Sequence, residues 1–130
     1  MGIHQQTHPS ISPVYVGEPV ELAPGMAAAR LLTNAEMCAD PRGLVHGGFT
    51  FGLADYAAML AVNHPNVVLG GAETRFLAPV RCGEVMVARA QLEEEKGRKR
   101  LVRCQVFVEE RLVFEGNFVC YVLDGHVLDQ

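Results

Sequence analysis

The sequence contains no tryptophan, and no apolar run approaches the ~18 residues that a membrane-spanning helix needs. Its N-terminus also lacks the charged and then apolar pattern of a secretory signal. These absences predict a cytoplasmic protein with no membrane partner. With 130 residues, 49% of them hydrophobic and 20% charged, the chain has the composition of a single globular domain over residues 1–130.

Positive charge is scarce as well. Eleven Lys and Arg residues stand against fifteen Asp and Glu residues, which gives a formal net charge of −4. A nucleic-acid surface needs a concentrated positive footprint. We therefore expect no nucleic-acid partner.

The four cysteines show none of the spacings that metal sites or disulfide frameworks require. They are widely scattered, with no CxxC pair and no His at ligand spacing. The pattern indicates free thiols and predicts no metal site. The four residues are Cys38, Cys82, Cys104 and Cys120.

Residues 43–63 are the most informative stretch, a glycine-rich turn that runs directly into an apolar segment. Phe49, Leu53, Tyr56 and Leu60 recur at spacings of four, three and four, which places them on one helical stripe. Alanines fill the other faces, so the helix is apolar nearly all round and should be wrapped by other elements. The proline at position 65 predicts that the helix ends near residue 63.

Asp55 is the exception within this helix. An unpaired buried carboxylate costs several kcal/mol or has a raised pKa. Helical geometry places Gly48 and Gly52 on the face of Asp55, where they put no side chain above it. The pattern predicts a slot with a carboxylate at its base and backbone N–H groups at its mouth. The alternative is a buried carboxylate satisfied by backbone or dimer contacts.

The rest of the chain is β in character, apart from residues 1–13, which are polar and predict a loose arm or a surface strap. Lys96 and Gly97 have the character of a hairpin turn. The expected order is one strand, one long helix and four strands joined mostly by tight hairpins. The extended segments fall at residues 26–33, 67–77, 84–92, 101–108 and 112–122, with a further short piece at 14–20.

An antiparallel sheet can cover a helix all round only if it curls about it. Such a sheet leaves unpaired edges, and two protomers that join their sheets side by side would remove one edge from each. We therefore expect a homo-oligomer, either a dimer or a tetramer.

This order, with Gly-Leu-Val-His-Gly-Gly-Phe at residues 43–49 and Leu-Ala-Asp at 53–55, resembles the hotdog-fold acyl-CoA thioesterases, specifically the phenylacetic-acid-type branch. The likeness runs from about Met26 to Tyr121 and includes Arg-Phe-Leu-Ala-Pro at 75–79 and Gly-Glu at 83–84. It implies an α+β hotdog fold, a curved antiparallel sheet of about five strands around one long central helix. It also implies hydrolysis of a small to medium acyl or aryl-acyl CoA, with the CoA thioester as substrate and no cofactor.

The resemblance implies roles for four residues of the central stretch. The backbone N–H of Gly47 would bind the thioester carbonyl oxygen, with Gly48 beside it. Asp55 would come from the opposite protomer and either activate water or attack the carbonyl directly. His46 matches the motif histidine, which shapes the turn or, less favoured, transfers a proton.

The sequence departs from this branch at two positions. Asp40 stands where many members carry Asn, and Leu69 and Gly70 stand where many carry Ser or Thr. Asn63 and Glu73 are nearby polar residues that can compensate, so Asp40, Asn63 and Glu73 are predicted substrate-binding residues. These departures favour a second hypothesis, a non-catalytic acyl-CoA-binding or sensing protein.

A short basic run at residues 96–100 is the candidate contact for the phosphates of CoA, with Arg98 and Lys99 as its central members. The alternative is a solvated hairpin turn whose charge is balanced by the glutamates at 93–95.

Overall fold

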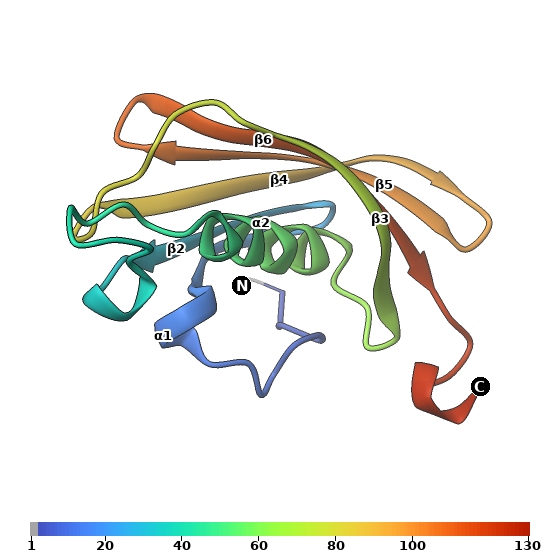
Figure 1. Ribbon diagram of the computed structural model, residues 1–130. Helices are drawn as coiled ribbons and strands as arrows, with labels where there is room; N and C mark the ends of the chain where they lie inside the picture. The colour runs from blue at the N-terminus through green and yellow to red at the C-terminus, as the bar shows by residue number, and fades with distance from the viewer. Residues whose placement is uncertain (1–2) are drawn as a thin grey trace.

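The computed structural model describes residues 3–130 as one curved antiparallel sheet that covers helix α2 (Figure 1). The sheet has six strands in the order β1-β2-β4-β5-β6-β3. The strands are β1 (Glu18–Ala23), β2 (Met26–Leu32), β3 (Val67–Phe76), β4 (Val85–Lys96), β5 (Lys99–Val108) and β6 (Arg111–Val122). The helices are α1 (Pro13–Val16), η1 (Ala35–Met37), α2 (Gly47–Val62) and η2 (Val127–Asp129).

This is the hotdog arrangement that the resemblance implies, with two corrections. The sheet has six strands rather than about five, and α2, at 16 residues, is of ordinary length rather than long. The additional strand is β1. The sequence predicted an extended piece at residues 14–20, but α1 occupies the first part and the strand begins only after Gly17, which has a φ of 104°. Pro19 is tolerated in β1 because β1 lies at the edge of the sheet.

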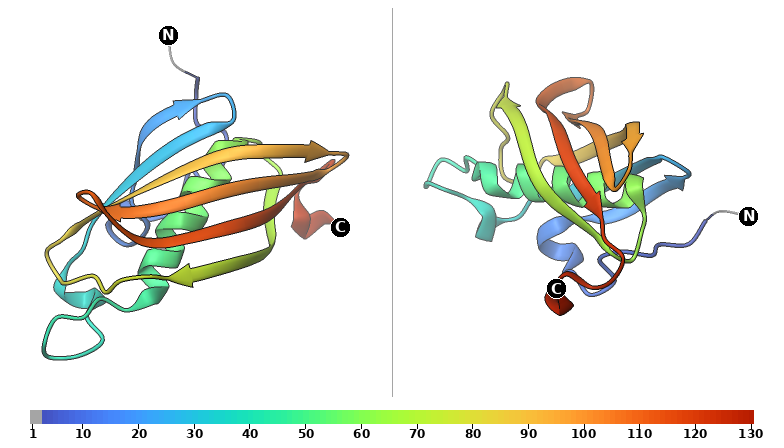
Figure 2. Two further views of the ribbon diagram at one scale, coloured as in Figure 1. Left: turned by 90° about the horizontal axis from the view of Figure 1, so that it is seen from above. Right: turned by 90° about the vertical axis from the view of Figure 1, so that its right-hand side faces the viewer.

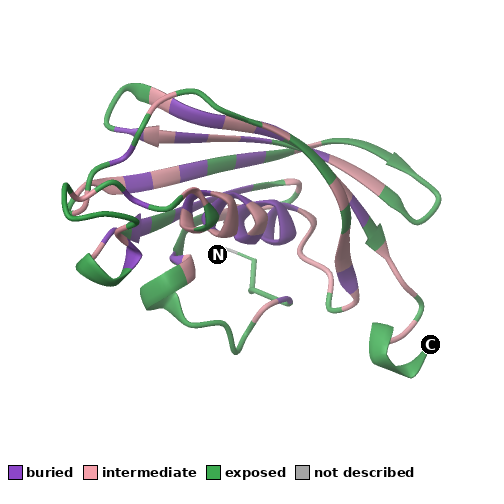
Figure 3. Cartoon of the chain, in the orientation of Figure 1, coloured by how far each residue is buried: buried purple, intermediate pink, exposed green. Residues whose placement is uncertain are grey.

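The core lies between α2 and the concave face of the sheet (Figures 2 and 3). Leu53 and Leu60 of the predicted stripe are fully buried, and Tyr56 is 4% exposed, whereas Phe49 is only partly buried. The predicted alternation in β5 is confirmed, since its even-numbered residues from Val102 to Val108 are buried. The hairpin between β4 and β5 turns at Gly97, as predicted.

Helix α2 ends where the sequence predicts. Asn63 follows its last residue in the left-handed conformation, with φ 52° and ψ 53°. Across residues 3–130, the structure contains no helix with the length and apolar character required to cross a membrane.

The N-terminal residues 3–12 lie against α2 on the side away from the sheet (Figure 1). The sequence predicted either a loose arm or a surface strap for this segment, and the observed contacts are those of a strap. The Gln6 N–H donates to Asn63 Oδ1 at 2.7 Å, and Asn63 Nδ2 donates to the His4 carbonyl at 2.8 Å. Gln5 Nε2 donates to the Tyr56 hydroxyl at 3.2 Å. The strap therefore covers the part of α2 that the sheet does not reach.

Replacing Asn63 should show how much this strap contributes. We expect Asn63→Ala to lower the free energy of unfolding by about 2 kcal/mol, because it loses two hydrogen bonds and places alanine at positive φ. Asn63→Gly keeps the favourable backbone geometry, so its loss should be about 1 kcal/mol. Urea denaturation measures both. Equal stability of the two variants and the wild type would mean that the strap is not held by Asn63.

Candidate functional site

The glycine turn before α2 is held in place by backbone bonds to the connection between β3 and β4. The Val45 N–H donates to the Val80 carbonyl at 2.9 Å, and the Cys82 N–H donates to the Gly43 carbonyl at 2.8 Å. The segment that enters the helix is therefore fixed along one side. His46, which caps the helix, is itself held through its N–H, which donates to the Met37 carbonyl at 2.8 Å.

The first two N–H groups of α2 are available to a ligand. The opening N–H groups of a helix have no acceptor within the helix, and no acceptor in the described chain bonds those of Gly47 and Gly48. A Cβ on Gly47 would lie 3.0 Å from the Phe76 ring, and one on Gly48 would lie 3.0 Å from the His46 ring. Glycine thus lets both rings approach this helix end closely.

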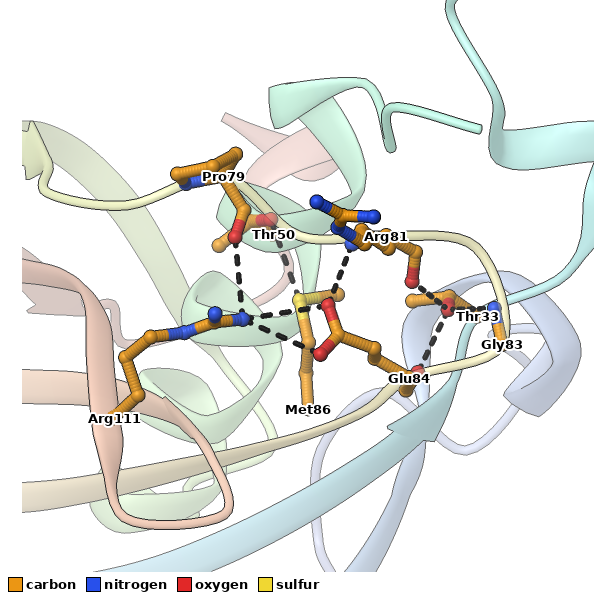
Figure 4. Close-up of polar contacts among 8 residues, drawn as sticks. All are labelled: Thr33, Thr50, Pro79, Arg81, Gly83, Glu84, Met86 and Arg111. Carbon is orange, nitrogen blue, oxygen red and sulfur yellow. Dashed lines mark hydrogen bonds and ion pairs between the residues drawn. The ribbon is translucent and has the colours of Figure 1, made fainter. Parts of the chain in front are cut away.

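A pocket of about 330 Å³ opens beside Gly47. Thr50 contributes its only polar side chain and is itself buried, with its hydroxyl directed to Met86 Sδ at 3.3 Å (Figure 4). No charged side chain lines it. Phe76 and Thr50 were not predicted as site residues. Thr50 could have been found because it lies one helical turn after Gly47. The lining residues are Val45, Gly47, Thr50, Phe76, Leu77, Ala78, Pro79, Val80 and Val113.

Asp55 lies in the middle of α2. Among the side chains of residues 3–130, its Oδ1 atom is the buried oxygen that has no hydrogen-bond partner. Burial raises the pKa of the Asp55 carboxyl to about 6. A Cβ on Gly52 would meet nothing within 4 Å. The position of Gly52, close to the carboxylate on its helical face, is therefore open, whereas the His46 ring lies against Gly48 on the same face.

Two buried thiols face this carboxylate from the sheet. Burial, and secondarily the charge of Asp55, raises the pKa of Cys104 and Cys120 to about 12. Both thiols therefore stay protonated at neutral pH. They present Asp55 with a weakly polar surface that supplies no compensating positive charge.

Gly47 and Asp55 cannot act on one carbonyl within a single protomer. Eight residues separate them, so they lie about 12 Å apart along the helix axis. A hydrogen bond to a developing oxyanion spans only about 3 Å. The separation fits the expectation that each site combines the glycine turn of one protomer with Asp55 of the other.

Asp40 and Asn63 are engaged in local structure. The exposed Asp40 accepts through Oδ1 from the N–H of Arg42 at 2.9 Å and of Leu44 at 3.2 Å, and so shapes the loop before the glycine turn. Asn63 holds the strap and lies about 24 Å from Gly47 along the helix axis. The structure therefore does not bring Asn63 to the glycine turn.

The other three predicted binding residues do not line the pocket beside Gly47 in the same protomer. Glu73 is exposed on β3, where it borders a hollow of about 450 Å³ together with Arg103. Arg98 and Lys99 lie at the turn between β4 and β5, and Arg98 pairs with Asp124. This turn adjoins the start of β3, whereas Gly47 adjoins its end, roughly 30 Å away.

No group of three or more His, Cys, Asp or Glu side chains within residues 3–130 is arranged to hold a metal ion.

A family model described as the thioesterase superfamily matches residues 42–115, more than half of the chain. The chain belongs to the thioesterase superfamily. The match contains the glycine turn, all of α2 and the strands β3, β4 and β5.

Individual proteins of known sequence extend the likeness. The chain is 50% identical over 113 residues to methylthioribose-1-phosphate isomerase of Aquifex aeolicus, covering 87% of this chain but 25% of that protein. It is 27% identical over 114 residues to the transcription factor FapR of Caldanaerobacter subterraneus, covering 87% of this chain and 57% of that protein. The thioesterase-superfamily unit thus spans a quarter of the first relative and just over half of the second.

Two solved structures share this fold over most of the chain. The uncharacterized protein PH1136 from Pyrococcus horikoshii is 53% identical, with a TM-score of 0.98 and 99% of each chain covered. A mutant of the phenylacetic acid degradation protein PaaI from Thermus thermophilus is 30% identical, with a TM-score of 0.77 and coverage of 83% of this chain and 95% of that one.

Proposed function

We propose that this superfamily member is an acyl-CoA thioesterase that acts as a homo-oligomer. One observation carries the proposal. Asp55, whose buried Oδ1 atom has no partner, lies close to the open position at Gly52, on the same helix that begins at the glycine turn. Membership of the thioesterase superfamily supports a thioester as the substrate.

In the proposed reaction, the Gly47 N–H donates to the thioester carbonyl oxygen. This N–H lies at the positive end of α2, and one such donor typically contributes about 3 kcal/mol of transition-state stabilisation. Asp55 of the partner protomer takes a proton from water as the water oxygen bonds to the carbonyl carbon. The carbon–sulfur bond then breaks, and the protonated Asp55 returns its proton so that CoA leaves as the thiol. In the alternative, the Asp55 carboxylate attacks the carbon directly and displaces CoA as the thiolate, which takes a proton from solvent, and water then hydrolyses the mixed anhydride to free the acid and Asp55.

The edge strand β3 supplies a way to bring two protomers together. Its outer edge is not paired with any strand of the described chain. Antiparallel pairing of two β3 edges would place the start of one strand beside the end of the other. The partner's turn with Arg98 and Lys99 would then lie at the end of β3 that contacts Gly47. This arrangement would allow these cations to meet the CoA phosphates of that site.

The pocket beside Gly47 favours an uncharged acyl group, because its lining contains no cation to pair with a second carboxylate. A panel of acyl-CoAs tests the proposal, with the released CoA thiol as readout. We expect turnover on uncharged acyl-CoAs and at least tenfold lower kcat/KM for malonyl-CoA. If the protein hydrolysed no member of the panel, the proposed thioesterase activity would be ruled out.

The pH dependence of the reaction should follow the ionisation of Asp55. Both mechanisms need the carboxylate, whose pKa is raised by burial to about 6. We therefore expect kcat/KM to be nearly constant above pH 7 and to fall about tenfold per pH unit well below 6. Stopped assays between pH 4.5 and 8.5, with circular dichroism at each pH to confirm folding, give the profile. A flat profile across pH 5 to 7 would exclude ionisation of Asp55 as a requirement.

A second candidate function is non-catalytic acyl-CoA binding. The observation that favours it is the likeness to the transcription factor FapR over most of this chain. It predicts saturable binding of an acyl-CoA without release of CoA. Isothermal titration calorimetry combined with the thiol assay separates the two functions.

A further inference from the structure

A network of polar side chains holds the segment that contributes Pro79 and Val80 to the pocket wall. Arg111, at the start of β6, donates through Nη2 to both carboxylate oxygens of Glu84 and to the Pro79 carbonyl, each at 3.3 Å (Figure 4). Glu84 Oε1 also accepts the Arg81 N–H at 2.7 Å. Glu84 and Arg111 together thus hold the backbone of residues 79–84, which form a turn between β3 and β4.

Thr33, the residue that follows β2, also holds the turn at residues 79–84. Its side chain is buried, and its hydroxyl donates to the Glu84 carbonyl at 2.7 Å and accepts the Gly83 N–H at 2.9 Å (Figure 4). The turn is therefore fixed at both of its sides. The Thr33 contacts involve no residue of the pocket lining, whereas Arg111 binds the carbonyl of Pro79, which is part of that lining.

The turn at residues 79–84 also forms backbone hydrogen bonds to the glycine turn. Val80 accepts the N–H of Val45, and Cys82 donates to Gly43, so both bonds end within four residues of Gly47. Val80 is also part of the pocket wall. Any displacement of residues 79–82 is thus transmitted to the N–H that would bind the thioester carbonyl.

We propose that Glu84, paired with Arg111, is a positioning residue for the Gly47 N–H and for the pocket wall. The proposal rests on the proposed function for its kinetic consequence, but its structural consequence is independent of turnover. The Glu84 and Arg111 side chains are 30% and 49% exposed. Ion pairs this accessible contribute little to global stability. The carboxylate therefore acts mainly on the local geometry of the turn.

The test compares two Glu84 variants with a matched control. Glu84→Ala removes the acceptor of the Arg81 N–H and the ion pair, whereas Glu84→Gln keeps an oxygen for Arg81 and loses only the charge. Glu21→Gln is the control, because Glu21 forms a similar exposed pair with Arg89 at 3.6 Å on the far side of the sheet.

Two readouts are measured on the full chain: the backbone amide chemical shifts of Gly47 and Gly48, and the kinetics on the best acyl-CoA. We expect Glu84→Ala to move both amide resonances and to lower kcat about tenfold with KM within about twofold. Glu84→Gln should give an intermediate effect. The control should change neither readout.

The proposal would be overturned if the Gly47 and Gly48 resonances of Glu84→Ala did not move. It would also be overturned if the wild type hydrolysed the substrate and Glu84→Ala had the same kcat. Should the wild type hydrolyse nothing, the proposed function fails, and the amide shifts alone decide the role of Glu84. A lowered melting temperature without either change would mean that the pair is only structural.

Discussion

Asp55→Asn is expected to lower kcat/KM for acyl-CoA hydrolysis by about 10³-fold while leaving the protein folded. The amide has nearly the same shape as the carboxyl group, so packing around α2 is preserved. It can neither accept a proton from water nor attack the thioester carbon. The thiol-release assay measures the loss, and an exposed position, Asp129→Asn, provides the control for a change of one charge.

The same substitution should raise stability, and the sign follows from the pKa. Burial raises the folded-state pKa of Asp55 from 3.8 to about 6. The charged form is therefore disfavoured in the folded state. The resulting destabilisation is absent below about pH 4, grows as the pH rises through the interval between the two pKa values, and is complete above about 6.

Asparagine carries no such cost. The variant should therefore be more stable than the wild type by on the order of 2 kcal/mol at pH 7.5 and nearly equal to it at pH 4, after allowance for partial exposure. Urea denaturation at both pH values checks this. A variant that hydrolyses acyl-CoA as fast as the wild type would remove Asp55 from the mechanism. Lower stability at pH 7.5 would instead show that the carboxylate has a favourable partner in the assembly.

The parts of this fold that were predictable are those in which local periodicity and burial agree. Helix α2 and the alternating strand β5 carry patterns that no other element would use. Strand β1 was predicted only as a short extended piece at residues 14–20, because Gly17 and Pro19 both weaken a strand pattern, and only the edge position in the finished sheet makes Pro19 acceptable. Local sequence cannot reveal which strand lies at an edge.

The site residues likewise differ in whether local sequence patterns could predict them. The isolation of Asp55 followed from helical geometry alone, because Gly48 and Gly52 lie on its face at fixed spacings. Arg98 and Asn63 were grouped with the site by type of side chain, yet the topology places both at the far end of α2 from Gly47. Phe76 and Glu84 reach the glycine turn only through tertiary contacts, which no periodicity encodes.

Gly52→Leu is expected to abolish acyl-CoA hydrolysis, with kcat/KM reduced more than about 100-fold, without unfolding the chain. A Cβ at this position meets nothing within 4 Å, so the protomer itself accommodates a side chain. Gly52 precedes Asp55 by three residues, close to one helical turn, and a leucine here would fill the space in which water and the thioester must meet the carboxylate.

Gly52→Ala separates this blocking effect from changes in the helix. Alanine is favoured over glycine within a helix, so this variant should gain about 0.5–1 kcal/mol of stability and lose much less activity than the leucine variant. Thermal unfolding, size-exclusion chromatography and the thiol-release assay are measured on both. Full activity of Gly52→Leu would place the chemistry elsewhere. A change of oligomeric state in Gly52→Leu alone would show that the partner protomer fills the open face at Gly52. In that case Asp55 would pack so closely against the glycine turn of the other chain that no room remained for a leucine side chain.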